Sequence, residues 1–311
     1  MADNSSRGAS LVASPCAICK TNGDGIECYP ARLDEEAIDA TTFSARRFHD
    51  RKIHFRMVRC RRCGLVRSDP VLPSEALTTL YTQSRFTYQN EIAYLKQTYG
   101  RYLRRCERLL SAKDRLLEIG CGNGFFLEEA RAQGFREVQG VEPSGDAISA
   151  AHPAIRPHIT QAMFSHDLFP PDSFDVACLF QTLDHLADPA RVLGDVMALL
   201  RPGGFLFAFN HNVSSWSARF FGERSPIIDI EHTYLYDPNT VRRLCESVGY
   251  TVIEARPAWN KLSLGYLASL IPLSPVVLKD ALIRFLTVSR LARVPLWLPL
   301  GNMYVIAQKP L

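Results

Sequence analysis

Three observations on the sequence predict an α/β fold in which helices connect the strands of a parallel sheet. Apolar runs alternate with amphipathic segments from about residue 111 onward, as in strands joined by helices. The glycine-rich turn GCGNG directly joins the first of these strands to a helix, an arrangement typical of nucleotide-binding βαβ units. A cysteine-rich stretch near the N-terminus shows little helical periodicity, so we expect it to form a small module of its own.

Turn signals set the boundaries of the expected elements. The sequences PPDSFD, RPGG and VGY each precede an apolar run, and such Pro, Gly and Asp clusters mark turns. The expected strands are Arg115–Ile119, Glu137–Glu142, Phe174–Phe180, Phe205–Asn210, Tyr250–Ala255 and Met303–Gln308. The expected helices include Phe125–Gln133, Ala190–Leu200 and Pro238–Val248. Between Pro257 and Gly301 we expect an apolar helical insertion before the last strand.

Composition and charge narrow the class of protein. The chain of 311 residues is 47% hydrophobic and 22% charged, which is typical of a globular protein with a sizeable core. Its longest charge-free apolar stretch, Leu262–Leu278, contains two prolines and is shorter than the about 20 residues of a spanning helix. The absence of a secretory signal and the spread of nine cysteines favour a reducing, cytoplasmic location.

The formal net charge of +4 is small, but its distribution is uneven. Between residues 46 and 67 there are nine Arg or Lys side chains and one acid, Asp50. Such a block is usually a solvated face, and it also keeps a nucleic acid or an anionic surface open as a partner.

Two C-x-x-C pairs, Cys16 with Cys19 and Cys60 with Cys63, predict a closed structural zinc site. Four thiolates suit tetrahedral zinc, and the glycine after the second pair permits a tight knuckle turn. The 40 residues between the pairs exceed the usual spacing, so the expected unit is a zinc ribbon with an insertion. A redox pair or coincidence are the alternatives. The other five cysteines are isolated, and we expect them in or near the core.

The glycine-rich turn reads E-x-G-x-G-x-G, from Glu118 to Gly124. A dinucleotide fingerprint would need glycine at position 125, which is Phe125. An acid just before the glycines is a poor neighbour for a pyrophosphate and a good one for a ligand with a cationic amino group. Glu142, at the end of the next strand, is placed to accept ribose hydroxyls. Gln181 lies at the end of a third expected strand and is the first residue of the polar sequence QTLDH.

These segments, together with LLRPGGFLFAFN and EHTYLYDPNTVRRLCESVGY, resemble the class I S-adenosylmethionine-dependent methyltransferases. The chain is most similar to the small-molecule group of polysaccharide and natural-product pathways. The resemblance covers about residues 75–256 and the final strand, and it implies a Rossmann-like sheet, S-adenosylmethionine as cofactor and methyl transfer as activity. It further implies that Glu118, Gly120, Gly122 and Gly124 surround the methionine moiety. It places Glu142 on the ribose and Gln181 at the methionine end.

The chain departs from related patterns at two points. Asp184 stands where the family more often has Glu, which is a mild change. Zinc ribbons ahead of this fold also resemble sugar C-methyltransferases, but these carry a further C-terminal region for which this chain has no room. C-methylation of a nucleotide-sugar is therefore in doubt.

The expected organisation has five parts: a flexible leader (1–14), a zinc-ribbon-like module (15–70), a helical connector or lid (71–110), the S-adenosylmethionine-binding methyltransferase domain (111–256), and an apolar helical segment with the final strand (257–311).

The acceptor is only partly defined. Enzymes that methylate adenine or glutamine nitrogens need a polar-Pro-Pro-aromatic turn where this chain has QTLDH, and cytosine-C5 enzymes need a Pro-Cys nucleophile that is absent outside the zinc pair. We expect O-methylation of a small molecule or of a glycan- or lipid-linked sugar. The alternative is an RNA base methyltransferase that docks RNA through its basic zinc ribbon. A non-catalytic binding module is a distant third.

Three histidines are candidates for a general base. His232 is preferred, because it lies in the polar and aromatic loop where this fold admits its acceptor, beside Glu231, which could orient it, and near Tyr234 and Tyr236, which offer stacking surfaces. His185 is second, and His211 could line the pocket.

The apolar segment 262–294 is expected to form a lid over the pocket, with a peripheral membrane contact as the alternative, since basic residues accompany its apolar face. In that segment, Leu278, Leu282, Phe285 and Leu286 are expected on one helix face. The oligomeric state is left open.

Overall fold

The computed structural model describes residues 10–33, 38, 53–84, 89–110, 112–271 and 275–311. Most of the expected leader and the basic residues from position 46 to 52 lie outside this part of the chain.

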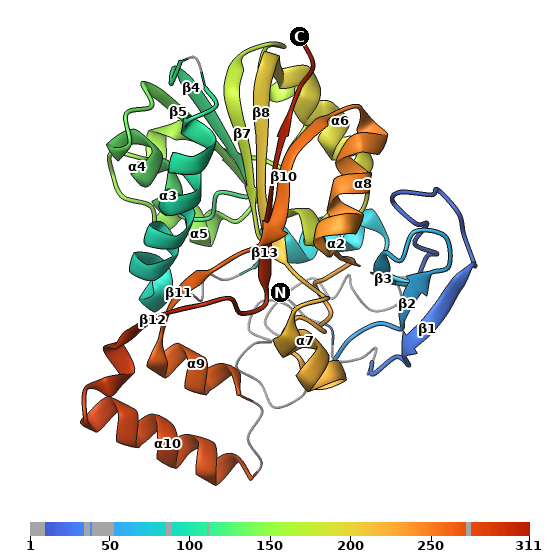
Figure 1. Cartoon of the computed structure of the whole chain (residues 1–311), viewed down its shortest axis with the longest axis vertical. Coiled ribbons are helices and arrows are strands. Elements are labelled where there is room, and N and C mark those ends of the chain that lie inside the picture. The colour runs from blue at the N-terminus through green and yellow to red at the C-terminus, as the bar shows by residue number, and fades with distance from the viewer. Residues whose placement is uncertain (1–9, 34–37, 39–52, 85–88, 111, 272–274) are drawn as a thin grey trace, which may run out of the picture.

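A seven-stranded sheet forms the centre of the molecule (Figure 1), with the strand order β10-β13-β8-β7-β4-β5-β6. Neighbouring strands are parallel except for β13, which is antiparallel to both β8 and β10. The strands are β4 (Arg115–Ile119), β5 (Glu137–Glu142), β6 (Ile159–Gln161), β7 (Phe174–Phe180), β8 (Leu200–His211), β10 (Thr251–Pro257) and β13 (Asn302–Gln308). All six expected strands are confirmed, whereas β6 was not predicted because three residues show no periodicity.

Helices cover both faces of this sheet (Figure 1). One face carries α3 (Ile92–Glu107) and α4 (Phe125–Ala132), and the other carries α6 (Pro189–Leu199) and α8 (Pro238–Val248). Successive strand residues face opposite sides: Leu116 packs with the α3 and α4 residues, and Leu117 packs with the α6 and α8 residues. The expected helices are confirmed to within one residue. The short helix α5 (Gly145–Ser149) follows β5.

The boundaries of α8 show how local sequence sets an element. Asp237 caps its N-terminus in a reciprocal capping box with Thr240, Pro238 occupies the first turn, and Gly249 ends it in the left-handed conformation. These are the residue types that begin and end helices most favourably.

A smaller antiparallel sheet lies beside the main one, with the order β1-β2-β3-β9. Its strands are β1 (Gly25–Tyr29), β2 (Met57–Cys60), β3 (Val66–Ser68) and β9 (Tyr234–Leu235). The cysteine-rich N-terminal residues thus share a sheet with the segment that directly follows His232. Helix α2 (Ser74–Thr82) leads from this sheet toward the main domain.

The expected insertion before the last strand contains α9 (Leu264–Leu270) and α10 (Val276–Val288), between the paired strands β11 (Asn260–Ser263) and β12 (Pro295–Leu298). It extends from one end of the molecule, on the same side as α7 (Trp216–Phe221) (Figure 1). The expectation of one apolar helix face is only partly met, because Leu286 is buried whereas Leu278 and Phe285 are exposed. Within the described ranges, no helix is both long and apolar enough to cross a membrane.

Candidate functional site

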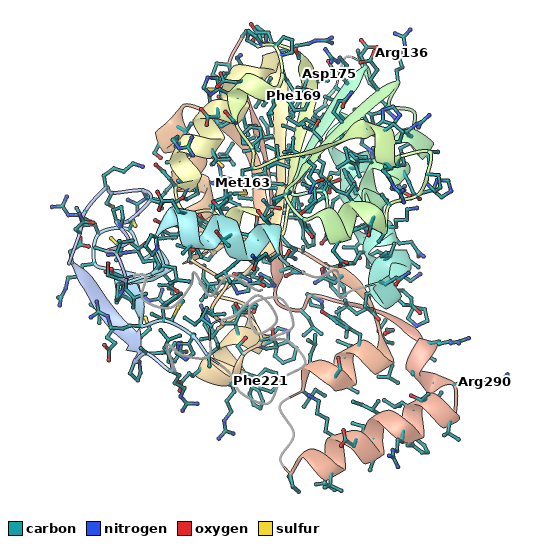
Figure 2. All side chains as sticks on the ribbon, turned by 180° about the vertical axis from the view of Figure 1, so that it is seen from behind. Arg136, Met163, Phe169, Asp175, Phe221 and Arg290 are labelled. Atoms are coloured by element: carbon teal, nitrogen blue, oxygen red, sulfur yellow. The ribbon has the colours of Figure 1, made fainter. Side chains whose placement is uncertain are left out.

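A cavity of about 730 Å³ opens at the carboxyl ends of β4, β5 and β7, the edge at which open α/β sheets bind ligands. Its wall combines the glycine-rich turn, two histidines and an apolar region. Met163, which follows β6, and Phe221 on α7 both line it and are labelled in Figure 2. The cavity therefore reaches from the sheet to the end of the molecule that carries α7 and α9.

The glycine-rich turn requires its glycines. Gly120, Gly122 and Gly124 have φ angles of 71°, 54° and 70°, a left-handed region that other residues rarely adopt. A Cβ atom on Gly120 would lie 2.6 Å from Thr182 Oγ1, and one on Gly124 would lie 2.6 Å from Ile155 Cγ2. Gly120 lines the cavity, so the turn brings bare backbone to the place where a ligand would bind.

Two buried carboxylates lie beside this turn. Glu142 accepts hydrogen bonds from the backbone nitrogens of Gly122 (2.8 Å) and Ser144 (2.9 Å), which fix its orientation. Burial raises the pKa of Glu142, although these hydrogen bonds oppose the rise. Burial raises the pKa of Glu118 well above its usual range, and the charge of Glu142 adds to this. Two neighbouring carboxylates in a cavity wall favour a ligand with a positive charge.

Gln181 directly follows β7 and lines the same cavity. Its φ angle is 51°, which is uncommon for a residue other than glycine. Its backbone nitrogen donates to the Phe209 carbonyl oxygen at 2.7 Å, and this bond to β8 holds the residue in place. The structure thus brings together all the residues predicted to surround the cofactor, although their roles stay predictions.

A cluster of three imidazoles surrounds Asp184, which is fully buried in the short 3-10 helix Leu183–His185 that follows β7. Its Oδ1 accepts from Asn210 Nδ2 at 2.9 Å, and its Oδ2 lies 2.7 Å from His211 Nδ1. His185 Nε2 and His232 Nε2 lie 3.8 and 3.9 Å from its two oxygens. Burial alone would raise the pKa of Asp184, but the imidazoles hold it far below the usual range.

The three imidazoles differ in their access to the cavity. The side chains of His185 and His211 are 13% and 14% exposed and line the cavity wall, whereas that of His232 is 1% exposed and lies behind them. The centroid of the His232 ring lies 4.8 Å from that of His185, with the rings tilted by 44°, and 4.6 Å from that of His211, in an edge-on contact at 67°.

The expected surroundings of His232 need correction. Glu231 Oε2 lies 3.5 Å from Nδ1 of His185, whereas Nδ1 of His232 lies 2.8 Å from the Ile227 carbonyl oxygen. Tyr234 and Tyr236 are buried, and their hydroxyls donate to the carbonyl oxygens of Pro15 and Leu183. The expectation that these tyrosines offer stacking surfaces to an acceptor is therefore wrong, because they pack in the core.

Cys16, Cys19, Cys60 and Cys63 converge as predicted, with all four sulfur atoms within 4.8 Å of one another. The sulfurs of Cys16 and Cys63 are 3.4 Å apart. Burial opposes ionisation of Cys60, yet the backbone nitrogens of Cys63 and Arg62 lower its pKa to about 7. Like-charged thiolates this close need a shared cation, so the cluster fits structural zinc. Among the other cysteines, Cys28 is partly exposed and the remaining four are buried.

Sequence reasoning missed two parts of the site. Asp184 was noted only as a departure from a pattern, although the adjacent Asp-His pair and the NHN sequence both follow strands that end at the same sheet edge. The part of the apolar wall that α7 contributes was not foreseen either, whereas the part contributed by residues 262–271 agrees with the lid expected there. The whole apolar wall is formed mainly by Trp216, Phe221, Leu264, Leu267, Leu270 and Ile271.

The single reversed strand, the glycine turn and the paired acids at the sheet edge define a class I, S-adenosylmethionine-dependent methyltransferase with a Rossmann-like sheet. A family model described as a methyltransferase domain matches residues 92–255. This is more than half of the chain, and the chain belongs to that methyltransferase family.

Curated relatives agree with this assignment. The chain is 30% identical over 169 residues to the ubiquinone biosynthesis O-methyltransferase of Aeromonas salmonicida, covering 49% of this chain and 71% of that protein. It is also 30% identical to the mitochondrial protein of the same name from Candida albicans and 33% identical to that of Paraburkholderia phymatum. These two matches cover 38% and 33% of this chain, and the chain spans less than half of those two relatives, 39% and 47%.

Among solved structures, the chain is similar to a SAM-dependent methyltransferase from Archaeoglobus fulgidus, with a TM-score of 0.48 and 21% identity over 71% of this chain and 99% of that one. The alternative expectation of an RNA base methyltransferase is not favoured, because the curated relatives are named as O-methyltransferases of ubiquinone biosynthesis.

Proposed function

We propose that this methyltransferase transfers a methyl group from S-adenosylmethionine to a hydroxyl of a small acceptor with an apolar body, including lipid-linked acceptors. The observation that carries the proposal is the composition of the cavity. One end holds the glycine turn with Glu118 and Glu142, and the other end is lined by apolar side chains of α7 and α9. The imidazoles of His185 and His211 line the same cavity, and we assign them to the reacting hydroxyl.

The cofactor end is assigned to S-adenosylmethionine residue by residue. Glu142 accepts the ribose hydroxyls, while Glu118 and the turn from Gly120 to Gly124 surround the methionine moiety. The carboxylates favour the cationic amino and sulfonium groups. Gln181, held in its left-handed conformation beside the turn, contacts the methionine end.

The acceptor end is apolar and roomy. It is lined by Leu264, Leu267 and Leu270 of α9 together with Trp216 and Phe221 of α7. The volume of the whole cavity lies within the roughly 300–1,000 Å³ range of small-molecule sites, and we assign one continuous cavity to cofactor and acceptor. The names of the curated relatives support an oxygen acceptor.

The reaction is an in-line displacement. The acceptor oxygen forms a bond to the methyl carbon as the carbon–sulfur bond breaks, S-adenosylhomocysteine leaves with the electron pair, and the hydroxyl proton passes to a base. The sequence favours His232 as this base and His185 second. The exposed fractions support His185 for direct contact, since it lines the cavity and Glu231 lies beside its Nδ1, with His232 acting behind it.

The same end of the molecule supports a peripheral membrane contact through residues 262–294. Val277, Phe285 and Val288 of α10 are exposed, at 74%, 62% and 87%. Arg284 and Arg290 accompany them, and Arg290 lies at the far end of α10 in Figure 2. An apolar face with basic residues can lie on an anionic bilayer, and the cavity wall formed by α9 would then adjoin the lipid.

The test is formation of S-adenosylhomocysteine with a panel of acceptors. Catechols with and without a long alkyl chain are compared with alkyl amines and with total RNA. We expect turnover with hydroxyl acceptors, with a lower KM for the alkylated ones. Turnover confined to amines or RNA would overturn the proposal, and so would a lower KM for acceptors without the chain.

A further inference from the structure

We infer that Asp184, His211 and His232 hold a divalent first-row metal ion at the wall of the cavity, separate from the zinc site of the four cysteines. The inference does not depend on the proposed O-methylation, because it rests on the donor atoms alone. Asp184 Oδ2, His211 Nδ1 and His232 Nε2 come from three different segments of the chain and lie within 4.8 Å of one another.

The distances suit a shared ion. Asp184 Oδ2 lies 2.7 Å from His211 Nδ1 and 3.9 Å from His232 Nε2. An ion with bonds of about 2.1 Å places its tetrahedral ligand atoms roughly 3.4 Å apart, and the two observed separations lie on either side of this value. The third separation, between His211 Nδ1 and His232 Nε2, is within 4.8 Å.

The partners of these ligands hold them in the form that binds metal. His232 Nδ1 lies 2.8 Å from the Ile227 carbonyl oxygen and 3.1 Å from Asp229 Oδ1, and since both oxygens accept, Nδ1 carries a proton. In the neutral ring, Nε2 then directs its lone pair toward the Asp184 carboxylate, so a cation held there would lie between two electron-pair donors. Asn210 donates to the other carboxylate oxygen at 2.9 Å. Such outer partners are typical of metal-binding histidines and carboxylates.

The framework around the three ligands is rigid. His211 ends β8, which pairs with two neighbours in the main sheet. The backbone of His232 accepts from Ser68 Oγ at 2.9 Å, and the nitrogen of Thr233 donates to the Asp184 carbonyl oxygen at 3.0 Å. The site is thus fixed by both sheets before any ion binds.

Metalloenzymes use two imidazoles and one carboxylate to bind zinc or iron(II), among other metals. This ligand set leaves a coordination position open for substrate or water. His211 also lines the cavity. An ion at this wall would favour the ionised form of a hydroxyl that reaches it.

Titration with Co²⁺ of protein whose cysteine site is loaded with zinc tests the inference. Cobalt binds such sites more weakly than zinc, so it leaves the four cysteines occupied. We expect one equivalent of Co²⁺ to bind, seen by calorimetry and by visible absorption without thiolate-to-cobalt charge transfer. His211→Gln and Asp184→Asn should abolish this binding. Asn210→Ala, which removes an outer partner, should weaken it about 10- to 100-fold.

His152→Ala is the matched control, since His152 is an exposed histidine outside the cluster, and it should bind like the wild type. Circular dichroism identifies variants that remain folded, so that His211→Gln decides the result if Asp184→Asn fails to fold. Absence of Co²⁺ uptake by the wild type would overturn the inference, and so would equal uptake by wild type and folded His211→Gln.

Discussion

The four-cysteine cluster and the Asp184 cluster each gather buried ligand-type side chains, yet they serve different purposes. The first cluster consists of four cysteines from two short knuckles. Within the part of the chain that the structure describes, none of these cysteines lines the cavity. The Asp184 cluster is mixed, comes from three segments, and has two members in the cavity wall. A closed set of equal ligands stabilises a fold, whereas a mixed set at a cavity can exchange protons or hold an ion for chemistry.

The two clusters are nevertheless connected. Strand β3, which follows the second cysteine pair, pairs with β9, which begins two residues after His232. Arg67 of β3 is fully buried, and its Nε donates to the Ser14 carbonyl oxygen at 2.7 Å, next to the first cysteine pair. Loss of the cysteine site would therefore disturb the histidine loop as well.

The largest effect is expected for Cys60→Ser. Structural zinc sites contribute on the order of 10 kcal/mol to folding, so this variant should lose its zinc and much of its solubility and thermal stability. Metal analysis and the unfolding temperature check this. Cys28→Ser, at an isolated and partly exposed cysteine, should match the wild type. Zinc content in Cys60→Ser equal to that of the wild type would contradict the comparison.

Removal of a histidine from the other cluster should affect turnover far more than cofactor binding. For His232→Ala and for His185→Ala we expect turnover to fall about 10²- to 10⁴-fold, the usual span for a positioned base, with S-adenosylmethionine affinity within a few-fold of wild type. Steady-state kinetics and calorimetry measure both quantities. Turnover within a factor of two of wild type would remove that histidine from the mechanism.

The glycine turn offers a sharper test of the cofactor site. Gly122→Val should abolish S-adenosylmethionine binding, because a branched side chain intrudes where the ligand approaches the backbone. Gly134→Ala is the control: it also has a positive φ angle, 100°, but a Cβ atom there meets nothing within 4 Å. Both variants incur left-handed strain of about 1–2 kcal/mol, so a difference in affinity reports the ligand contact. NADH binding as strong as that of S-adenosylmethionine would contradict the assignment.

The affinity for S-adenosylmethionine should depend on pH. Burial raises the pKa values of Glu118 and Glu142 above the ordinary value of 4.5, and the charged carboxylates favour the cationic ligand. Affinity is therefore expected to fall as pH decreases through these raised values, beginning at a higher pH than for a free carboxylate. Calorimetry at several pH values measures the affinity. In Glu142→Gln, we expect the affinity to depend less on pH. A midpoint at or below 4.5 would count against the role of these residues.

The smallest effect concerns the membrane. We expect partial flotation with anionic liposomes, reduced by Val288→Asp at the most exposed of these apolar residues on α10. Ala281→Asp, which adds the same charge at an exposed small residue of that helix, serves as the control. Protein that stays wholly at the bottom of the gradient would support a lid over the pocket.

Prediction from sequence succeeded where the determinants are local. The strand Arg115–Ile119, the bounds of α8 and the convergence of the two cysteine pairs were predicted from neighbouring residues and are confirmed. The grouping of Glu118, Glu142 and Gln181 in one cavity wall was predictable because strand order places them at one edge of the sheet. The convergence of His185, His211 and His232 on Asp184 depends on how three distant segments pack. Strand order brings His185 and His211 to one sheet edge, but spacing carries no signal for His232. The membership of β9 in the small sheet is non-local in the same way.

The central claim is that the cavity beside Asp184 performs methyl transfer to oxygen, and a single-turnover experiment tests it most directly. S-adenosylmethionine with an isotopically labelled methyl group is bound to wild type and to His185→Ala, and an alkylated catechol is added. With the wild-type protein, we predict that the label appears in a methyl ether of the catechol. With His185→Ala, we predict that it stays on the sulfonium of S-adenosylmethionine far longer. Label transferred at equal rates by both proteins, or found on an atom other than oxygen, would contradict the account.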